Sequence, residues 1–205
     1  INIKTYKGSL INEPWKIKNK SGTFFKVFTP YWKTCLEEMS NLRLSNVPKK
    51  IDTLNIQNPE IILFKNLKLF PKNLKWIKSL SSNWIPGEKK ALEIFNNFKK
   101  NIINYYDIGR DRPDKNLTSK LSPYLHFGEI SPERIFNDVK KLNIPNENSK
   151  KKYLAEIGWR EFSYNLLYYY PNIKTAPIQQ KFKKFPWKKN TKNLKAWQEG
   201  KTGYP

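Results

Sequence analysis

One stretch of this chain carries more structural information than any other: Tyr153-Leu154-Ala155-Glu156-Ile157-Gly158-Trp159-Arg160-Glu161-Phe162. It lies inside a segment, about 149–169, whose pattern predicts one long helix that stops before a proline. Side chains three and four positions apart share a helix face. We therefore expect Glu156, Trp159 and Arg160 to point the same way. Such a face can hydrogen-bond a base edge, stack on a base and hold a phosphate.

A second informative segment lies upstream and reads Thr118-Ser119-Lys120-Leu121-Ser122-Pro123-Tyr124-Leu125-His126-Phe127-Gly128. Its first five residues place three hydroxyls and one ammonium group where a helix is expected to begin. The free N–H groups and the dipole at such an end favour an anion such as a pyrophosphate. The same residues are also typical of an ordinary Ser/Thr helix cap, and spacing alone leaves both interpretations open.

The rest of the second half also has a helical pattern. Apolar residues recur at three- and four-residue spacing from 87 to 106. Ser131-Pro132 predicts the start of a helix that runs to about Leu142, and a last helix is expected at about 191–198. The fold class predicted from these patterns is mainly α.

The first part of the chain is less regular. Short β-type runs at 1–3 and 24–28 predict strands, and a helix is expected from Thr29 to about Asn41. We interpret 1–30 as the tail of an α/β domain, 31–86 as a linker, and 87–205 as the first part of a helical domain. The ends do not resemble natural termini, so a fragment is expected.

The charge balance points to a polyanionic partner. The chain has 205 residues, with 39 Lys and Arg against 17 Asp and Glu, a net charge of +22 and a pI near 9.9. Neutralising phosphates releases counterions and adds affinity, so nucleic acid is the leading candidate. The alternative is that heavy use of Lys, Asn and Ile reflects a biased genome composition.

Other features limit the possible functions. A single cysteine, Cys35, excludes an internal disulfide and favours a reducing compartment. No apolar run approaches a membrane span and no signal peptide opens the chain, so we expect a cytoplasmic protein without a membrane partner. No residues have metal-ligand spacing. His126, the one histidine, is expected to be a packed or hydrogen-bonded group.

Four blocks of sequence carry a resemblance to a known family. The 118–128 segment is similar to the flavin-binding signature of the photolyase/cryptochrome family, and Tyr106 stands where that family places a tyrosine against the flavin. The 26–31 and 196–205 segments, KVFTPY and AWQEGKTGYP, match two further blocks. All four occur in the family's order over nearly the whole chain, and they are most similar to class I photolyases.

The resemblance implies a set of cofactors. It implies flavin adenine dinucleotide (FAD), active in its reduced anionic form, and a second antenna chromophore, a folate or deazaflavin, on an N-terminal domain. The cofactor-binding residues carried over by the match are Tyr106, Thr118, Ser119, Lys120, Leu121, Ser122 and Tyr153. Lys120 departs from the arginine or serine of many relatives, which puts one phosphate contact in doubt.

The Glu156-x-x-Trp159-Arg160 pattern resembles the repair enzymes for cyclobutane pyrimidine dimers more than the signalling cryptochromes. The resemblance implies catalytic roles for two residues, Trp159 stacking on a flipped-out dimer and Glu156 hydrogen-bonding the thymine edges. Without it, Trp159 would be a core aromatic and Glu156 and Arg160 a solvated pair. The DNA-binding residues implied are Arg110, Glu156, Trp159, Arg160 and Ser163.

Trp187 matches the outermost tryptophan of the family's electron-transfer chain, and we expect it near the surface. Hydrophobic anchoring is the alternative role for this side chain.

These expectations combine into one hypothesis. A monomeric bacterial enzyme, cytoplasmic and associated with the nucleoid, would repair pyrimidine dimers in DNA with blue light, although this portion alone would be inactive. The alternatives are a cryptochrome-type photoreceptor, a non-enzymatic basic nucleic-acid-binding domain and, less favoured, repair of the (6-4) photoproduct.

Overall fold

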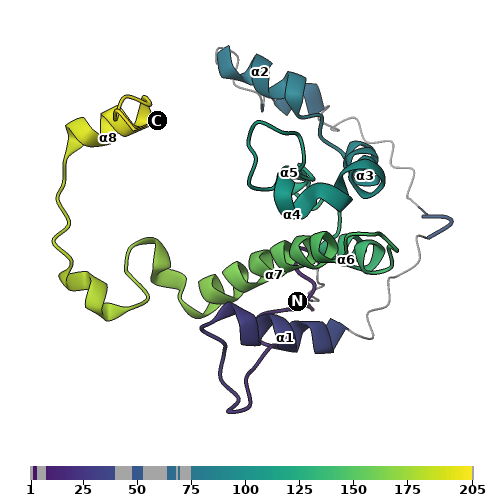
Figure 1. The fold of residues 1–205 in the computed structure, drawn as a ribbon, viewed down its shortest axis with the longest axis horizontal. Helices are drawn as coiled ribbons and strands as arrows, with labels where there is room; N and C mark the ends of the chain where they lie inside the picture. The colour runs from purple at the N-terminus through teal and green to yellow at the C-terminus, as the bar shows by residue number, and fades with distance from the viewer. Residues whose placement is uncertain are drawn as a thin grey trace. The chain divides into compact units, whose positions relative to one another are not determined.

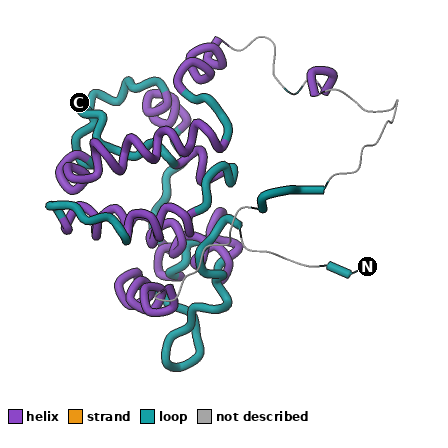
Figure 2. The backbone as a smooth tube through the Cα atoms, turned by 90° about the vertical axis from the view of Figure 1, so that its right-hand side faces the viewer, coloured by secondary structure: helices purple, strands orange, loops and turns teal. Residues whose placement is uncertain are grey.

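The computed structural model describes residues 2–3, 8–39, 48–52, 64–67, 69 and 75–204. Within these ranges all regular structure is helical, as Figures 1 and 2 show. The α-helices are α1 (Phe28–Glu38), α2 (Lys75–Asn83), α3 (Glu88–Asn97), α4 (Tyr106–Gly109), α5 (Ser122–His126), α6 (Pro132–Lys140), α7 (Glu147–Tyr169) and α8 (Thr191–Gln198). The predicted class, mainly α, is confirmed.

The chain divides into two units, residues 1–165 and 166–205. The core of the first unit is built around α7, which contributes an apolar stripe with Tyr153, Ile157 and Phe162 buried. Aromatic rings from the neighbouring elements pack on this stripe. The Phe98 ring lies 4.5 Å from that of Tyr153, and the Tyr31 ring lies 5.1 Å from that of Phe162.

Helix α1 packs unusually close to α7 at Gly158. A Cβ atom at that position would lie only 2.5 Å from the Trp32 ring, which real Cβ contacts do not tolerate. Trp32 also meets Phe136 of α6 edge to face, with ring centroids 6.2 Å apart. The glycine in the middle of α7 is therefore explained by this close approach, which offsets its low helix propensity.

The start of α7 is fixed by a polar cluster that also holds α4. Asn146 caps the helix, because its Oδ1 accepts a 3.1 Å hydrogen bond from the Ser149 N–H. The Asp107 carboxylate accepts bonds from the Ser149 hydroxyl at 2.8 Å and from the side-chain amides of Asn146 and Asn148. The Ser149 bond and the amide bonds lower the pKa of Asp107. This cluster joins the two elements that carry Tyr106 and Tyr153.

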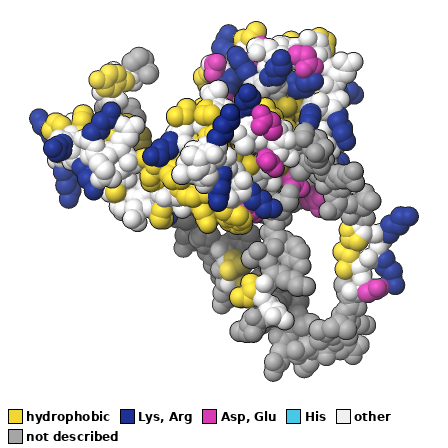
Figure 3. All heavy atoms as spheres, turned by 90° about the horizontal axis from the view of Figure 1, so that it is seen from below, with side chains coloured by type: hydrophobic (Ala, Val, Ile, Leu, Met, Phe, Trp, Pro, Cys, Tyr) yellow, Lys and Arg dark blue, Asp and Glu magenta, His cyan; other side chains and the backbone are white. Residues whose placement is uncertain are grey.

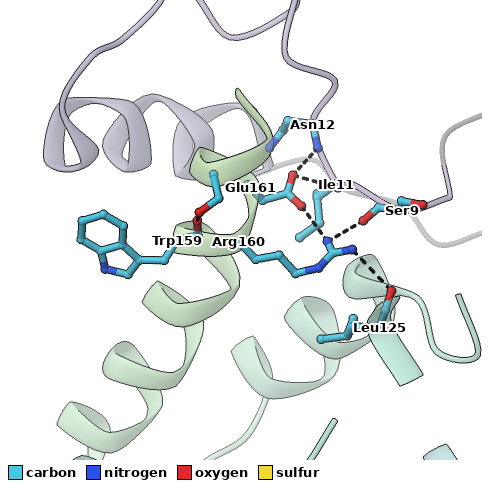
Figure 4. A network of polar contacts seen from close by, with 8 residues as sticks. Ser9, Ile11, Asn12, Leu125, Trp159, Arg160 and Glu161 are labelled. Carbon is cyan, nitrogen blue, oxygen red and sulfur yellow. Dashed lines mark hydrogen bonds and ion pairs between the residues drawn. The ribbon is translucent and has the colours of Figure 1, made fainter. Parts of the chain in front are cut away.

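The N-terminal segment is tied to α7 by the buried Glu161. Its Oε2 accepts 2.9 Å hydrogen bonds from the backbone N–H groups of Ile11 and Asn12, 150 and 149 positions away (Figure 4). Burial raises the pKa of Glu161 to about 7, against the opposing effect of these bonds and of Arg160. The sequence reasoning above gave Glu161 no role.

The second unit, 166–205, holds the end of α7, two short 3₁₀ turns at Pro171–Lys174 and Gln180–Lys184, and α8. Helix α8 begins with a side-chain cap, because Asn190 Oδ1 accepts a 2.9 Å bond from the Asn193 N–H. Its bounds agree with the predicted 191–198 segment.

The two predicted strands are wrong. Asn2 and Ile3 are irregular, residues 24–27 form bends and coil, and Phe28 is already the first residue of α1; Ile1 lies outside the described residues. The apolar side chains of 24–28 find ring partners in place of a neighbouring strand. Phe25 packs edge to face on Tyr31. Packing of this kind outweighs local β-propensity.

The predicted linker at 31–86 contains two helices, α1 and α2. Tyr31, Cys35 and Met39 are buried in the first unit, so one face of 31–39 belongs to the core, while Leu36 and Glu37 are exposed. Helix α2 forms where no periodicity was noticed, while much of the remaining segment lies outside the described residues. The domain boundaries at 30 and 86 stay predictions.

Candidate functional site

A cavity of about 450 Å³ opens between α4, α5 and α7 in the first unit. It brings together segments that are far apart in the sequence. The lining residues are Tyr106, Ser119, Ser122, Leu125, His126, Tyr153, Glu156, Ile157, Arg160 and Tyr164. Six of them were predicted from sequence to bind cofactor or DNA: Tyr106, Ser119, Ser122, Tyr153, Glu156 and Arg160.

The aromatic wall of this cavity is formed by Tyr106 and Tyr153. Their rings meet edge to face at 5.0 Å, and Phe98 supports both from behind. Burial raises the pKa of both phenols, so each stays neutral at neutral pH. The Tyr153 hydroxyl is buried beside the Ser119 side chain, which partly offsets the effect of burial on its pKa, but it forms no hydrogen bond of ordinary geometry within the described residues. A ligand with a polar atom at this position would satisfy it.

The Thr118–Ser122 segment separates this cavity from a second one of about 440 Å³. Ser119 lines both cavities, whereas Thr118 and Lys120 line only the second. Lys120 has a left-handed backbone, with φ at 54°, and its Nζ donates to Asn116 Oδ1 at 2.9 Å. The positive φ turns the chain sharply between the two cavities.

One expectation about this segment stays a prediction and another needs correction. Leu121 is 1% exposed and lines neither cavity, so its cofactor contact stays a prediction. Helix α5 begins at Ser122 without any side-chain hydrogen bond at its cap, so the Ser/Thr cap interpretation does not describe it. Ser119 and Ser122 line the cavity instead.

Arg110 and Glu156 form an ion pair. Both side chains are about one-third exposed, and the Arg110 guanidinium also lies 5.9 Å from the Tyr106 ring centroid. The hydrogen bond that the Arg110 guanidinium donates to Glu156 raises the pKa of Arg110. The carboxylate predicted to read bases and the guanidinium predicted to hold a phosphate therefore neutralise each other in the free chain.

Arg160 is committed to contacts within the protein. Its guanidinium donates to the backbone carbonyls of Ser9 and Leu125 and lies 3.6 Å from Glu161 Oε1 (Figure 4). Its side chain is only 18% exposed. The structure thus places Arg160 as a clamp between α7, α5 and the N-terminal segment, with one edge on the cavity.

Trp159 does not share the cavity face, contrary to expectation. In Figure 4 its side chain and that of Arg160 extend to different sides of α7. Its ring stacks on Phe28 of α1, with centroids 3.8 Å apart and planes 9° from parallel. The ring remains 45% exposed. Adjacent residues of a helix are about 100° apart around the helix axis, so Trp159 and Arg160 point in different directions. The aromatic side chains of α1 hold Trp159 on the side of α7 that faces α1.

The remaining predicted residues lie at the surface. Ser163 is exposed, and its hydroxyl donates to the Trp159 carbonyl one turn earlier. Trp187, in the second unit, is 77% exposed and contacts Phe185 with ring centroids 4.6 Å apart. The expected surface position of Trp187 is confirmed, whereas its role is untested.

Sequence reasoning missed three lining residues, Leu125, Ile157 and Tyr164, and gave His126 a packed role. His126 is exposed and lines the cavity. Tyr164 lies under the Arg160 guanidinium, 5.1 Å from it. Tyr164 follows Tyr153, Glu156, Ile157 and Arg160 at helical spacing, so periodicity could have identified this residue.

The described residues contain no group of three or more His, Cys, Asp or Glu side chains that could hold a metal ion. Every helix in those ranges is too short or too polar to span a membrane.

Comparison with known proteins gives two family matches. The model for the FAD binding domain of DNA photolyase matches residues 153–205, and the model for DNA photolyase matches residues 1–51. These segments contain α7 from residue 153 onward, with all its cavity-lining side chains, and the N-terminal segment that hydrogen-bonds to Glu161.

The similar proteins include both repair enzymes and photoreceptors. A deoxyribodipyrimidine photo-lyase of Agrobacterium fabrum is 35% identical over the whole chain, which covers 43% of that protein. Cryptochrome-2 of Arabidopsis thaliana is 32% identical over the whole chain, which covers 35% of it. The crystal structure of a bacterial class III photolyase from Agrobacterium tumefaciens matches 97% of this chain with a TM-score of 0.86 and 36% identity. The chain spans less than half the length of these relatives.

Proposed function

This chain belongs to the photolyase/cryptochrome family, and on that premise we propose that it forms part of a light-driven enzyme that repairs cyclobutane pyrimidine dimers in DNA. One observation carries the proposal. The cavity between α4, α5 and α7 gathers six residues that the family resemblance assigns to flavin and lesion. These residues come from three separate segments, and a chance grouping of that kind is improbable.

We assign the flavin contacts to the hydroxyl-bearing side of the cavity. Ser119 and Ser122 offer donors to phosphate oxygens, and Tyr106 and Tyr153 offer a neutral aromatic wall. The buried Tyr153 hydroxyl lies beside Ser119 without a hydrogen bond of ordinary geometry, which supports a bound polar group at this position. Reduced FAD would supply the electron that opens the dimer, while the protein supplies position and a dry environment.

Glu156 is proposed to accept hydrogen bonds from the thymine edges, and Arg110 to hold a DNA phosphate. Their mutual ion pair sets a condition on both roles. A phosphate that takes Arg110 releases the Glu156 carboxylate for the base edge. Binding of the DNA phosphate by Arg110 and of the thymine edge by Glu156 would therefore be coupled, because each side chain exchanges its partner in the ion pair for a group of the DNA. Such an exchange avoids the cost of leaving either charge unpaired.

Trp159 is proposed to stack on the flipped-out dimer with the ring area left open by Phe28. Base stacking on an aromatic side chain contributes about 1–3 kcal/mol per base. Phe28 would then act as a support that holds the indole plane fixed, so stacking costs little ordering entropy. Ser163 would act beside this contact, whereas Arg160 would act from the cavity side of α7.

A cryptochrome-type photoreceptor is the second candidate function, and the 32% identity to Cryptochrome-2 supports it. It would use the same flavin site without repairing DNA. The two functions separate in a blue-light assay with the full-length protein and an oligonucleotide that contains one thymine dimer. If the protein is a repair enzyme, thymine absorbance returns in the light and does not return in the dark. Photoreduction of the flavin without any repair of the dimer would contradict the enzyme proposal.

A non-enzymatic basic nucleic-acid-binding domain is the alternative from another class. It predicts a colourless purified protein whose DNA affinity depends on salt alone.

The remaining parts of the repair proposal are an antenna chromophore, a monomeric state, a nucleoid association and an electron-entry role for Trp187. For the last of these, Trp187→Phe should slow photoreduction of oxidised flavin while sparing repair by enzyme reduced beforehand.

A further inference from the structure

The second unit has a charge balance different from that of the rest of the chain. Residues 166–205 hold nine of the 39 basic residues, all lysines, and one of the 17 acidic residues, Glu199. Eight of the lysines lie between Lys174 and Lys195, with no acidic residue among them. A genome bias toward lysine codons raises lysine everywhere but does not remove acids from one segment. The imbalance is therefore local.

The positive charge of this segment is mostly unneutralised. All eight lysines between Lys174 and Lys195 are exposed. Lys195 pairs with Glu199, and none of the other seven forms an ion pair within the described part of the chain. In Figure 3 the corresponding dark blue side chains gather at the left, where the second unit is drawn. A segment of this kind attracts polyanions.

Large aromatic side chains alternate with these lysines. Phe182, Phe185 and Trp187 are 45%, 53% and 77% exposed. The Phe185 and Trp187 rings lie 4.6 Å apart, and the Lys181 ammonium lies 5.2 Å from the Phe182 ring. Three neighbouring exposed aromatics mark an interaction site more often than a solvated surface. Bases of any sequence can stack on such rings, because every base has a π-face.

The backbone that carries these groups is mostly irregular between the 3₁₀ turn and α8. The 3₁₀ turn Gln180–Lys184 ends at Phe185, and residues 186–190 have no regular structure until α8 begins. The Phe185 carbonyl accepts a 2.7 Å hydrogen bond from the Trp187 N–H, which closes a three-residue turn around Pro186. The Phe185 and Trp187 rings lie close together across this turn.

We propose that the segment Lys174–Lys195, the basic aromatic segment, is a second nucleic-acid contact that binds single-stranded DNA. Its lysines hold phosphates, and Phe182, Phe185 and Trp187 stack on unpaired bases. None of these residues lines the cavity of the first unit. The proposal goes beyond lesion repair, because it assigns affinity for undamaged single strands to a separate part of the chain.

The test removes charge from this segment and from a control surface. In the full-length protein loaded with FAD, Lys183, Lys184 and Lys188 are changed to Gln. The control variant changes Lys89, Lys100 and Lys141, which are exposed and form no ion pair among the described residues. The measurement is the affinity for a labelled, undamaged thymine oligonucleotide at several salt concentrations. For the first variant we expect the slope of log K against log salt to fall by about 2, with at least roughly tenfold weaker binding at low salt.

The control variant should change the slope of log K against log salt by less than half of the change seen in the first variant. An equal change in both variants would show a general effect of net charge and overturn the proposal. An unchanged oligonucleotide slope, with slower photoreduction by the anion ascorbate, would also overturn it and assign the segment to an anionic electron donor instead. Discrimination between damaged and undamaged duplex should stay intact in both variants. Absence of repair by the parent protein, with single-strand binding weakened only in the first variant, would contradict the repair proposal alone.

A second pair of variants tests the aromatic contribution without touching Trp187. Phe182→Ala and Phe185→Ala should each weaken single-strand binding about tenfold, as for one lost stack, and leave duplex binding nearly unchanged. Equal losses on both substrates, or no loss on either, would refute stacking by this segment.

Discussion

The two sides of α7 differ in what covers them. One side, with Tyr153, Glu156 and Tyr164, lines a cavity with α4 and α5. The other side, with Gly158, Trp159 and Phe162, is packed by the rings of α1. Both sides are rich in aromatic residues, so their composition does not distinguish them. The difference shows that a helix face becomes a site or a core according to the elements that reach it.

Phe162 and Tyr164 provide the strongest test of this comparison. Phe162 is 5% exposed and meets Phe28, Tyr31 and Trp159, whereas Tyr164 is 37% exposed. Phe162→Ala should lower the free energy of unfolding by about 3–5 kcal/mol, while Tyr164→Ala should lower it by less than about 1 kcal/mol. Denaturant titration of both variants measures this. Similar losses would remove the distinction between a packed and an open side.

Glu161 gives the next largest effect, as a dependence of stability on pH. Burial raises its pKa from 4.5 to about 7, so between these values the folded state binds a proton that the unfolded state lacks. Stability should therefore fall as pH rises through this window, by up to about 3 kcal/mol. Glu161→Gln should remove most of this dependence of stability on pH. The control Glu37→Gln, at an exposed position, should leave the dependence unchanged. Thermal unfolding from pH 4.5 to 8 is the measurement, and identical profiles for all three proteins would refute the assignment.

Trp159 tests whether the packed side also contributes to lesion binding. Trp159→Ala should cost about 1–3 kcal/mol of affinity for a dimer-containing oligonucleotide. Phe28→Ala removes the support but leaves the indole, and we expect a smaller loss. Competition binding with damaged and undamaged duplex measures both variants. Unchanged discrimination by Trp159→Ala would leave Trp159 as a packing residue only.

The Arg110–Glu156 pair gives the smallest expected effect and concerns the cavity side. Arg110→Ala should reduce the salt slope of DNA binding by about 1, whereas Lys115→Ala, at an exposed lysine outside the cavity lining, should change it less. Glu156→Gln frees Arg110 and should raise affinity for undamaged DNA while lowering repair. A lower affinity for undamaged DNA in Glu156→Gln would argue against the proposed exchange of partners.

The sequence predicted local structure well where the pattern is periodic. The helices expected at 149–169 and 191–198 are found at Glu147–Tyr169 and Thr191–Gln198, because caps and apolar spacing are local signals. The strand expected at 24–28 is not found, since Phe25 and Phe28 pack on rings from elsewhere. Tertiary partners of this kind cannot be read from a short window.

The same limit applies to the site. Helical spacing placed Glu156 and Arg160 together correctly, and the family resemblance added Tyr106, Ser119, Ser122 and Tyr153. The orientation of Trp159 and the anchor formed by Glu161 were missed. Both depend on α1 and the N-terminal segment, more than 120 positions away. Only the folded structure brings those partners next to α7.

The central claim is that the cavity between α4, α5 and α7 holds the flavin, and flavin content tests it most directly. Ser122→Trp fills the cavity from α5, while Ser163→Trp adds the same bulk at an exposed position outside the lining. The full-length protein and Ser163→Trp should purify yellow or blue with about one FAD per chain. Ser122→Trp should be colourless with unchanged helical circular dichroism. A colourless parent protein, or full flavin content in Ser122→Trp, would contradict the account.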